Sequence, residues 1–97
     1  MRESDLQKDV IKHLKKIPKC WYQKNMKTNR NGIPDIVGCI DGKMFAIELK
    51  ANDKDFRQVS KLQRIELSKI NDAGGIGFYA NNFKYVKDTL DFFFTEL

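Results

Sequence analysis

Two acids and one lysine in the segment GIPDIVGCIDGKMFAIELKA, residues 32–51, are residue types from which a hydrolytic site can be built. They are Asp35, Glu48 and Lys50. A tight two-residue turn at Asp41-Gly42 places Asp35 opposite Glu48 on antiparallel strands, with their Cβ atoms about 4.5–5.5 Å apart. Lys50 follows Glu48 by two residues and therefore shares its face of the strand. Like charges at this spacing destabilise a hairpin unless a cation lies between them.

This arrangement of side chains suits a hard divalent cation. Mg²⁺ prefers oxygen ligands, takes one or two carboxylates and keeps several waters. Once bound, it polarises a phosphoryl oxygen and lowers the pKa of a bound water, while the Lys50 ammonium can stabilise charge that develops on a phosphate. By itself, Glu48-x-Lys50 also fits a solvent-facing strand with a cross-strand salt bridge. The opposed Asp35, which follows Gly32-Ile33-Pro34, favours the metal site.

Helices and further strands must hold this hairpin in place. A capping box at Ser4–Gln7 predicts the start of a first helix, with Leu6, Val10, Leu14 and Ile17 on its apolar face. Pro18 ends that helix at or just before Ile17. Residues 20–24 are predicted to form a strand that precedes the hairpin.

The second half of the chain repeats the alternation of helix and strand. Ser60–Gln63 is a second capping box and opens a helix with Leu62, Ile65 and Ile70 predicted to face inward. Gly74-Gly75 ends this helix, residues 76–80 form a fourth strand, and residues 83–96 form a last helix. The chain is therefore predicted to be one α/β domain over residues 1–97, a mixed sheet flanked by helices in the order αβββαβα.

Composition agrees with a soluble globular protein. The chain has 97 residues and is 41% hydrophobic, and its mean hydropathy is −0.55. No apolar run approaches the roughly 20 residues that span a bilayer, and the N-terminus lacks a signal peptide. We therefore expect a cytoplasmic protein with no membrane partner, in which Cys20 and Cys39 are free thiols.

The net charge of +5 is unevenly distributed along the chain. Residues 12–34 contain bases and aromatic residues but no acid. Such a block is either a solvated face or a surface that attracts a phosphate backbone, and charge alone leaves both interpretations open. The bases that we predict to bind nucleic acid are Lys12, Lys16, Lys24, Lys27 and Arg30.

Three short stretches, GIPDIVG, FAIELKA and SKLQ, together resemble the VRR-NUC branch of the PD-(D/E)XK nuclease superfamily. The resemblance covers about residues 1–80 and implies a restriction-endonuclease-like core in the order αβββαβ, to which the last helix is an addition. It also implies that Asp35 and Glu48 hold Mg²⁺ or Mn²⁺ together with the main-chain carbonyl of Leu49. In the same comparison Lys50 is the catalytic lysine beside the attacking water.

Two further site residues follow from this resemblance. Gln63 matches the active-site glutamine of the family. Glu3 in the first helix matches an acid that approaches the metals, although Asp5 is close enough in sequence to take that place.

The sequence thus predicts a Mg²⁺- or Mn²⁺-dependent endodeoxyribonuclease that selects branched DNA, a Holliday junction or a flap, by its shape. The resemblance implies a homodimer, and the compactness of the domain leads us to expect a phage or bacterial host. Two alternatives are a non-catalytic nucleic-acid-binding module of the same fold and an interaction protein that acts through its aromatic C-terminal helix. For the dimer and the interaction protein, the run Phe92-Phe93-Phe94 should leave at least one ring available to a partner.

Overall fold

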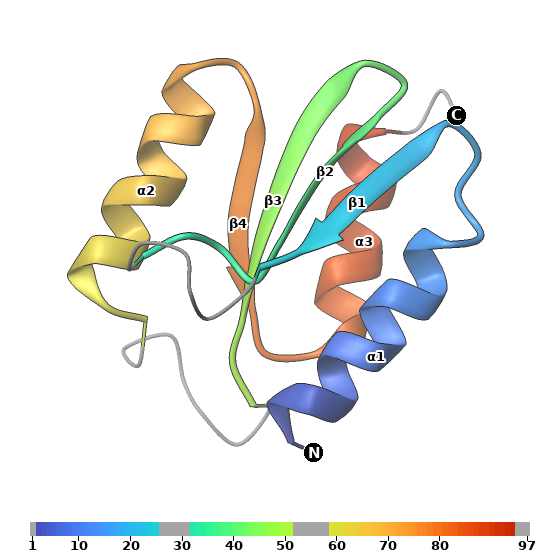
Figure 1. The fold of residues 1–97 in the computed structure, drawn as a ribbon, viewed down its shortest axis with the longest axis horizontal. Helices are drawn as coiled ribbons and strands as arrows, with labels where there is room; N and C mark the ends of the chain where they lie inside the picture. Colours follow the sequence, from blue (N-terminus) through green and yellow to red (C-terminus); the bar gives the residue numbers. More distant parts are fainter. Residues whose placement is uncertain (1, 26–31, 52–58, 95–97) are drawn as a thin grey trace.

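A computed structural model describes residues 2–25, 32–51 and 59–94. In chain order the elements are α1 (Glu3–Leu14), β1 (Cys20–Lys24), β2 (Ile36–Ile40), β3 (Lys43–Leu49), α2 (Lys61–Asp72), β4 (Ile76–Ala80) and α3 (Phe83–Phe93). The strands form one sheet in the order β1-β2-β3-β4. The pairs β1–β2 and β2–β3 are antiparallel, and the pair β3–β4 is parallel. Helix α2 lies on one face of the sheet and α1 and α3 on the other (Figure 1), which confirms the predicted mixed sheet and element order.

The β2–β3 hairpin has the predicted register. Its pairs run from Ile40 with Lys43 to Ile36 with Ile47. At the turn, Asp41 has φ of 51° and Gly42 has φ of 85°, and two positive φ values are what a type I′ turn requires. This local geometry sets the pairing of every residue further along both strands.

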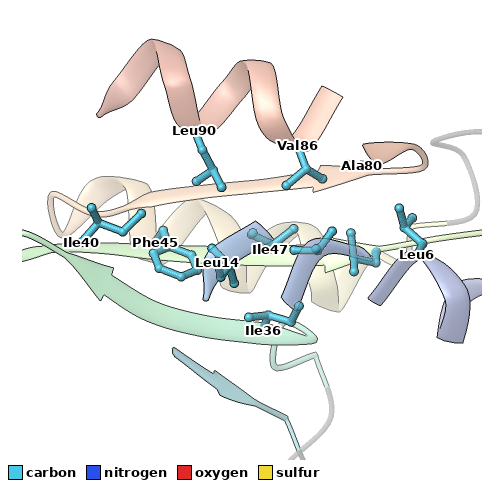
Figure 2. Packing of buried hydrophobic residues seen from close by; sticks show 11 residues of the cluster. Leu6, Leu14, Ile36, Ile40, Phe45, Ile47, Ala80, Val86 and Leu90 are labelled. Carbon is cyan, nitrogen blue, oxygen red and sulfur yellow. The ribbon is translucent and has the colours of Figure 1, made fainter. Parts of the chain in front are cut away.

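The hydrophobic core lies between the sheet and the pair α1 and α3. Phe45 and Ile47 of β3 point into it, and Val86 and Leu90 of α3 approach from the opposite side (Figure 2). The predicted α1 face is also confirmed, since its buried residues are Leu6, Val10 and Leu14. This packing makes β3 the central rigid element of the domain.

Helix α2 connects the parallel strands β3 and β4 and runs back along the sheet. Its predicted capping box is present, since Ser60 Oγ accepts from the Gln63 N–H (3.1 Å) and Gln63 Oε1 accepts from the Ser60 N–H (2.8 Å). Gly74 and Gly75 end the helix by donating to carbonyls of its last turn. The first turn of α2 therefore lies toward the end of the sheet where β3 finishes (Figure 1).

Both predicted ends of α1 are wrong. The helix begins at Glu3 with Arg2 as its N-cap and no side-chain cap, so Ser4 lies inside the first turn, where Glu3 and Asp5 interact favourably with the helix dipole. It ends at Leu14, and the N–H groups of Lys16 and Ile17 bond three residues back instead of four. The chain tightens into these turns before Pro18 because the α conformation is disfavoured for the residue that precedes a proline.

The predicted inward face of α2 is also wrong for two of its three residues. Leu62 and Ile65 are 43% and 40% exposed, whereas Glu66 and Leu67 are buried. Leu67 and Ile70 lie against Gly77 of β4, which has no side chain to hold the helix away. The close packing of α2 on Gly77 therefore decides how the helix is rotated about its axis, and the number of apolar residues on a face does not.

Helix α3 begins at residue 83 as predicted but ends at Phe93, earlier than residue 96. Phe94 packs against the core, while Phe92 and Phe93 are 74% and 44% exposed. These two rings meet edge to face with centroids 5.0 Å apart. The expected exposure of at least one ring is therefore confirmed, and a partner for it stays a prediction.

Across the described ranges 2–25, 32–51 and 59–94, none of the helices is both long and apolar enough to cross a bilayer. Cys20 and Cys39 are free thiols, as predicted.

Gly38→Ala is expected to lower the free energy of unfolding by about 2 kcal/mol or more through overpacking. A Cβ at this position would lie 2.1 Å from the Trp21 carbonyl oxygen and 2.8 Å from Cζ of Phe45. Neither β1 nor the core ring can move away cheaply. Urea denaturation at 25 °C measures the loss. Gly42→Asn is the control, because it has open space and asparagine tolerates this turn. A Gly38→Ala protein as stable as the control would contradict this packing.

Candidate active site

The candidate site lies where β3 ends, β2 begins and α1 begins. Asp35 immediately precedes β2, and its Oδ2 accepts a hydrogen bond of 2.7 Å from the Leu49 N–H of β3. Its main-chain carbonyl accepts from the Asn25 N–H (2.7 Å) after β1. Backbone on both neighbouring strands therefore orients Asp35.

Glu48 is the most deeply buried acid among the described residues, with 2% of its surface exposed. The hairpin register continues one pair past Ile36 and Ile47 and brings Glu48 opposite Asp35. The pKa of Glu48 is raised to about 9, chiefly by burial and then by the hydrogen bond with Asp35 and the charge of Asp35, while Lys50 opposes the shift. Glu48 Oε2 has no hydrogen-bond partner within the described part of the chain.

Lys50 and Glu3 complete the group of charges around Glu48. The charge of Lys50 lowers the pKa of Glu48, and the charge of Glu3 raises it, so both side chains are close to this carboxyl group. Glu3 Oε1 also accepts from the Ala51 N–H (3.3 Å), which ties the start of α1 to the chain leaving β3 (Figure 1). Of the two acids proposed for this place, it is Glu3 that makes this contact.

Gln63 is half-buried in the first turn of α2, toward the end of the sheet that carries the site. Its Oε1 accepts from the Ser60 N–H (2.8 Å), so the capping box fixes the orientation of the carboxamide. The side-chain NH₂ can then serve only as a donor. Gln63 is thus prepared to donate to an anionic oxygen.

The sequence analysis missed one buried acid, Glu66, which lies on the face of α2 that carries Gln63 and is 6% exposed. A Cβ at Gly32 would lie 3.2 Å from Glu66 Cγ and 2.6 Å from Leu62 Cγ, so only a glycine lets this segment pass under α2. Gly32 has φ of 87°, a conformation that glycine adopts at little cost. The sequence feature that could have identified Glu66 is its three-residue spacing from Gln63, which places both residues on the same face of the helix.

The side chains present fit a divalent cation. A buried carboxylate oxygen without a donor, beside a second carboxylate, is what a cation would satisfy. Within residues 2–25, 32–51 and 59–94, no three His, Cys, Asp or Glu side chains gather closely enough to hold a metal. The protein side-chain ligands would thus be the Asp35–Glu48 pair, with Glu3 further out and water in the remaining positions.

The predicted DNA-binding bases are not all near this site. Lys24 ends β1 and pairs with Ile36, whose side chain is in the core, so the Lys24 side chain leaves the sheet on the face opposite to Asp35 and Glu48. Lys12 lies in the last turn of α1, about 14 Å along the helix from Glu3, and Lys16 is further still. Lys27 and Arg30 lie outside the described residues.

The fold and the site together define an α/β domain, a mixed sheet between helices with a carboxylate pair at the open end of its hairpin. No protein-family model matches the chain, and a search of curated proteins found no match. A solved structure described as a "VRR_NUC domain" superposes with a TM-score of 0.75 over 95% of this chain and 96% of that one, at 22% sequence identity. The chain therefore has the fold of a VRR-NUC domain, as its sequence predicts.

Glu48→Gln is expected to stabilise the metal-free protein as pH rises. The folded-state pKa of about 9 exceeds the usual 4.5, so folded protein keeps a proton that the unfolded chain loses. The stability contributed by Glu48 is present below pH 4.5 and is lost as pH rises through about 9. Glutamine cannot ionise and is not subject to this loss. Urea denaturation in EDTA across this range should show a gap that widens by roughly 1–3 kcal/mol. Parallel pH profiles for the two proteins would contradict the burial of this carboxyl group.

Proposed function

We propose that this protein is a Mg²⁺- or Mn²⁺-dependent endonuclease that hydrolyses phosphodiester bonds in DNA. The observation that carries this proposal is the Asp35–Glu48 pair, in which burial raises the pKa of Glu48 to about 9 and leaves its Oε2 without a partner. A protein that only binds phosphate gains nothing from two adjacent acids. The likeness to the VRR-NUC fold supports the nuclease over a site of another class.

In this proposal each residue has a separate task. Asp35, Glu48 and the Leu49 carbonyl hold the metal, which polarises a phosphoryl oxygen and lowers the pKa of water when bound. Glu48 must lose its proton for this to occur, so binding releases a proton. The Lys50 ammonium stabilises negative charge on the phosphate and orients the attacking water. The fixed NH₂ of Gln63 donates to the same region, and Glu3 accepts from water at its edge.

DNA is the proposed substrate because the chain has a net charge of +5 and exposed bases such as Lys24, Lys12 and Lys16 can contact phosphate. Phosphate contacts of this kind position a substrate without reading its sequence. We therefore propose selection by shape, with a Holliday junction or flap as substrate, in a bacterial cytoplasm or that of a phage-infected host. Lys12 and Lys16 would hold the arm of DNA that leaves the site along α1.

A homodimer is proposed because one site cuts one strand, and a two-fold axis presents two sites to opposite strands. The exposed edge-to-face pair Phe92 and Phe93 is an apolar patch suited to a second copy of the chain.

Lys50→Ala is expected to reduce metal-dependent cleavage by about 10²–10³-fold, because it removes a charge that stabilises the transition state. Labelled linear, flap and four-way DNA would be incubated with Mg²⁺, Mn²⁺ or EDTA. Lys43→Ala is the matched control, since Lys43 is an exposed lysine on the same strand, and it should cleave as the wild type does. Glu48→Ala should also be inactive. DNA binding without cleavage by the wild type in either metal would establish the binding module instead.

Replacing both Phe92 and Phe93 by serine is expected to convert a dimer to a monomer, because the substitutions remove the apolar patch. Light scattering coupled to size-exclusion chromatography measures the mass. Trp21→Ser is the control, since it removes an exposed aromatic ring from β1 and should leave the dimer intact. A wild-type protein that is monomeric at micromolar concentration, with or without DNA, would refute the dimer.

A further inference from the structure

A cavity of about 480 Å³ lies between α2 and β4 and extends around the edge of β4 to Tyr85 of α3 on the other face of the sheet (Figure 1). Its walls include Arg64, Ser68 and Asn71 of α2, Gly77 and Tyr79 of β4, and Tyr85 of α3. The volume is in the range of small-molecule pockets, about 300–1,000 Å³. None of the described residues that line it is acidic. The function proposed above assigns no task to this cavity.

The cavity is next to the carboxylate pair. Tyr79 of β4 pairs with Glu48 of β3 in the parallel ladder, so their side chains leave the same face of the sheet. Adjacent strands are about 4.8 Å apart, so Tyr79 in the wall of the cavity lies one strand spacing from Glu48 and two from Asp35. A DNA strand held at the carboxylate pair would have a neighbouring nucleotide within reach of this cavity.

The walls of the cavity have the chemistry of a base-binding surface. Tyr79 and Tyr85 supply aromatic rings, and Phe78 lies against Tyr85 with ring centroids 6.3 Å apart. Unpaired bases stack on such rings whatever their sequence. Arg64 adds a positive charge near the first turn of α2, and Ser68 adds a hydroxyl group. A base inside a duplex is stacked on both sides, so only an unpaired nucleotide can use this surface.

The edge of β4 is closed to a peptide strand at this point. Asn71 Oδ1 accepts from the Gly77 N–H (2.8 Å), and Asn71 Nδ2 donates to the Gly77 carbonyl (3.0 Å). The Asn71 side chain therefore occupies the N–H and the carbonyl of Gly77, the two groups that an added strand would bond at this position. A peptide that pairs with the sheet edge is thus a poor occupant, and the aromatic and basic walls remain for a nucleotide.

We infer that the α2–β4 cavity binds an unpaired nucleotide that flanks the scissile phosphate. This inference rests on the proposed nuclease function and deepens it: the preferred substrate has a single-stranded nucleotide next to the cut, as a flap or an opened junction does. Tyr85 is a specificity-determining residue in this arrangement and takes no part in the hydrolysis.

Nuclear magnetic resonance of the whole chain in EDTA, titrated with a short oligothymidylate, tests the inference without any cleavage. The amides of Ser68, Gly77 and Tyr79 should shift on binding. Tyr85→Ala should weaken binding about tenfold, because stacking on one ring is lost, and Tyr85→Phe, which keeps the ring, should stay within about twofold. Trp21→Ala is a further control on the opposite edge strand and should bind as the wild type does.

The outcomes separate this inference from the proposed function. Shifts confined to the basic face around Lys12 and Lys16, or a Tyr85→Ala protein that binds normally, overturn the cavity as a nucleotide site even if Mg²⁺-dependent cleavage is found. Shifts at Gly77 that Tyr85→Ala abolishes establish the site even if no DNA is cleaved. In the active enzyme, Tyr85→Ala should reduce cleavage of a flap relative to a fully paired duplex, and an unchanged ratio would overturn the assigned specificity.

Discussion

The buried contact between Glu48 and Asp35 is the constraint on which the other features of this end of the domain depend. Removing Glu48 from water makes its ionisation costly, and a second carboxyl group adds to that cost, so the pKa of Glu48 rises to about 9. The Leu49 N–H donates to Asp35, and Lys50 offsets part of the negative charge. Without metal, a shared proton relieves the repulsion. A divalent cation would replace that proton and release it to the solvent.

The burial of Glu48 is unfavourable, and the burial of apolar side chains on the other face of β3 offsets it. Phe45, Ile47 and Leu49 of β3 are fully buried in the main core against α1 and α3 (Figure 2). Because side chains alternate along a strand, the core residues hold the backbone that carries Glu48 between them. The acid is thus fixed on the most rigid element of the domain, and such rigidity is what a site needs to bind a metal in one geometry.

Two surfaces with different properties meet at this site. On the β1 side, the exposed Lys24 ends the strand on the face opposite to Asp35 and offers a contact to phosphate. On the β4 side, the cavity next to Tyr79 offers aromatic rings and the charge of Arg64. A substrate in which a paired arm gives way to an unpaired nucleotide would match both surfaces at once. The exposed Phe92 and Phe93 lie in the last turn of α3 and do not line this cavity.

Local rules determined the part of the site that lies within the hairpin. The Asp41-Gly42 turn sets the register of the hairpin, so the two turn residues alone predict that residues 35 and 48 face each other. The capping box at Ser60 likewise predicts that a helix starts there and carries Gln63 in its first turn. Long-range packing decided the rest: the rotation of α2 that exposes Leu62 and Ile65, the approach of Glu3 to Ala51, and the cavity beside β4. Hydrogen bonds and φ preferences act over a few residues and can be deduced from sequence, whereas burial, and with it the protonation of Glu48, depends on which distant surfaces meet.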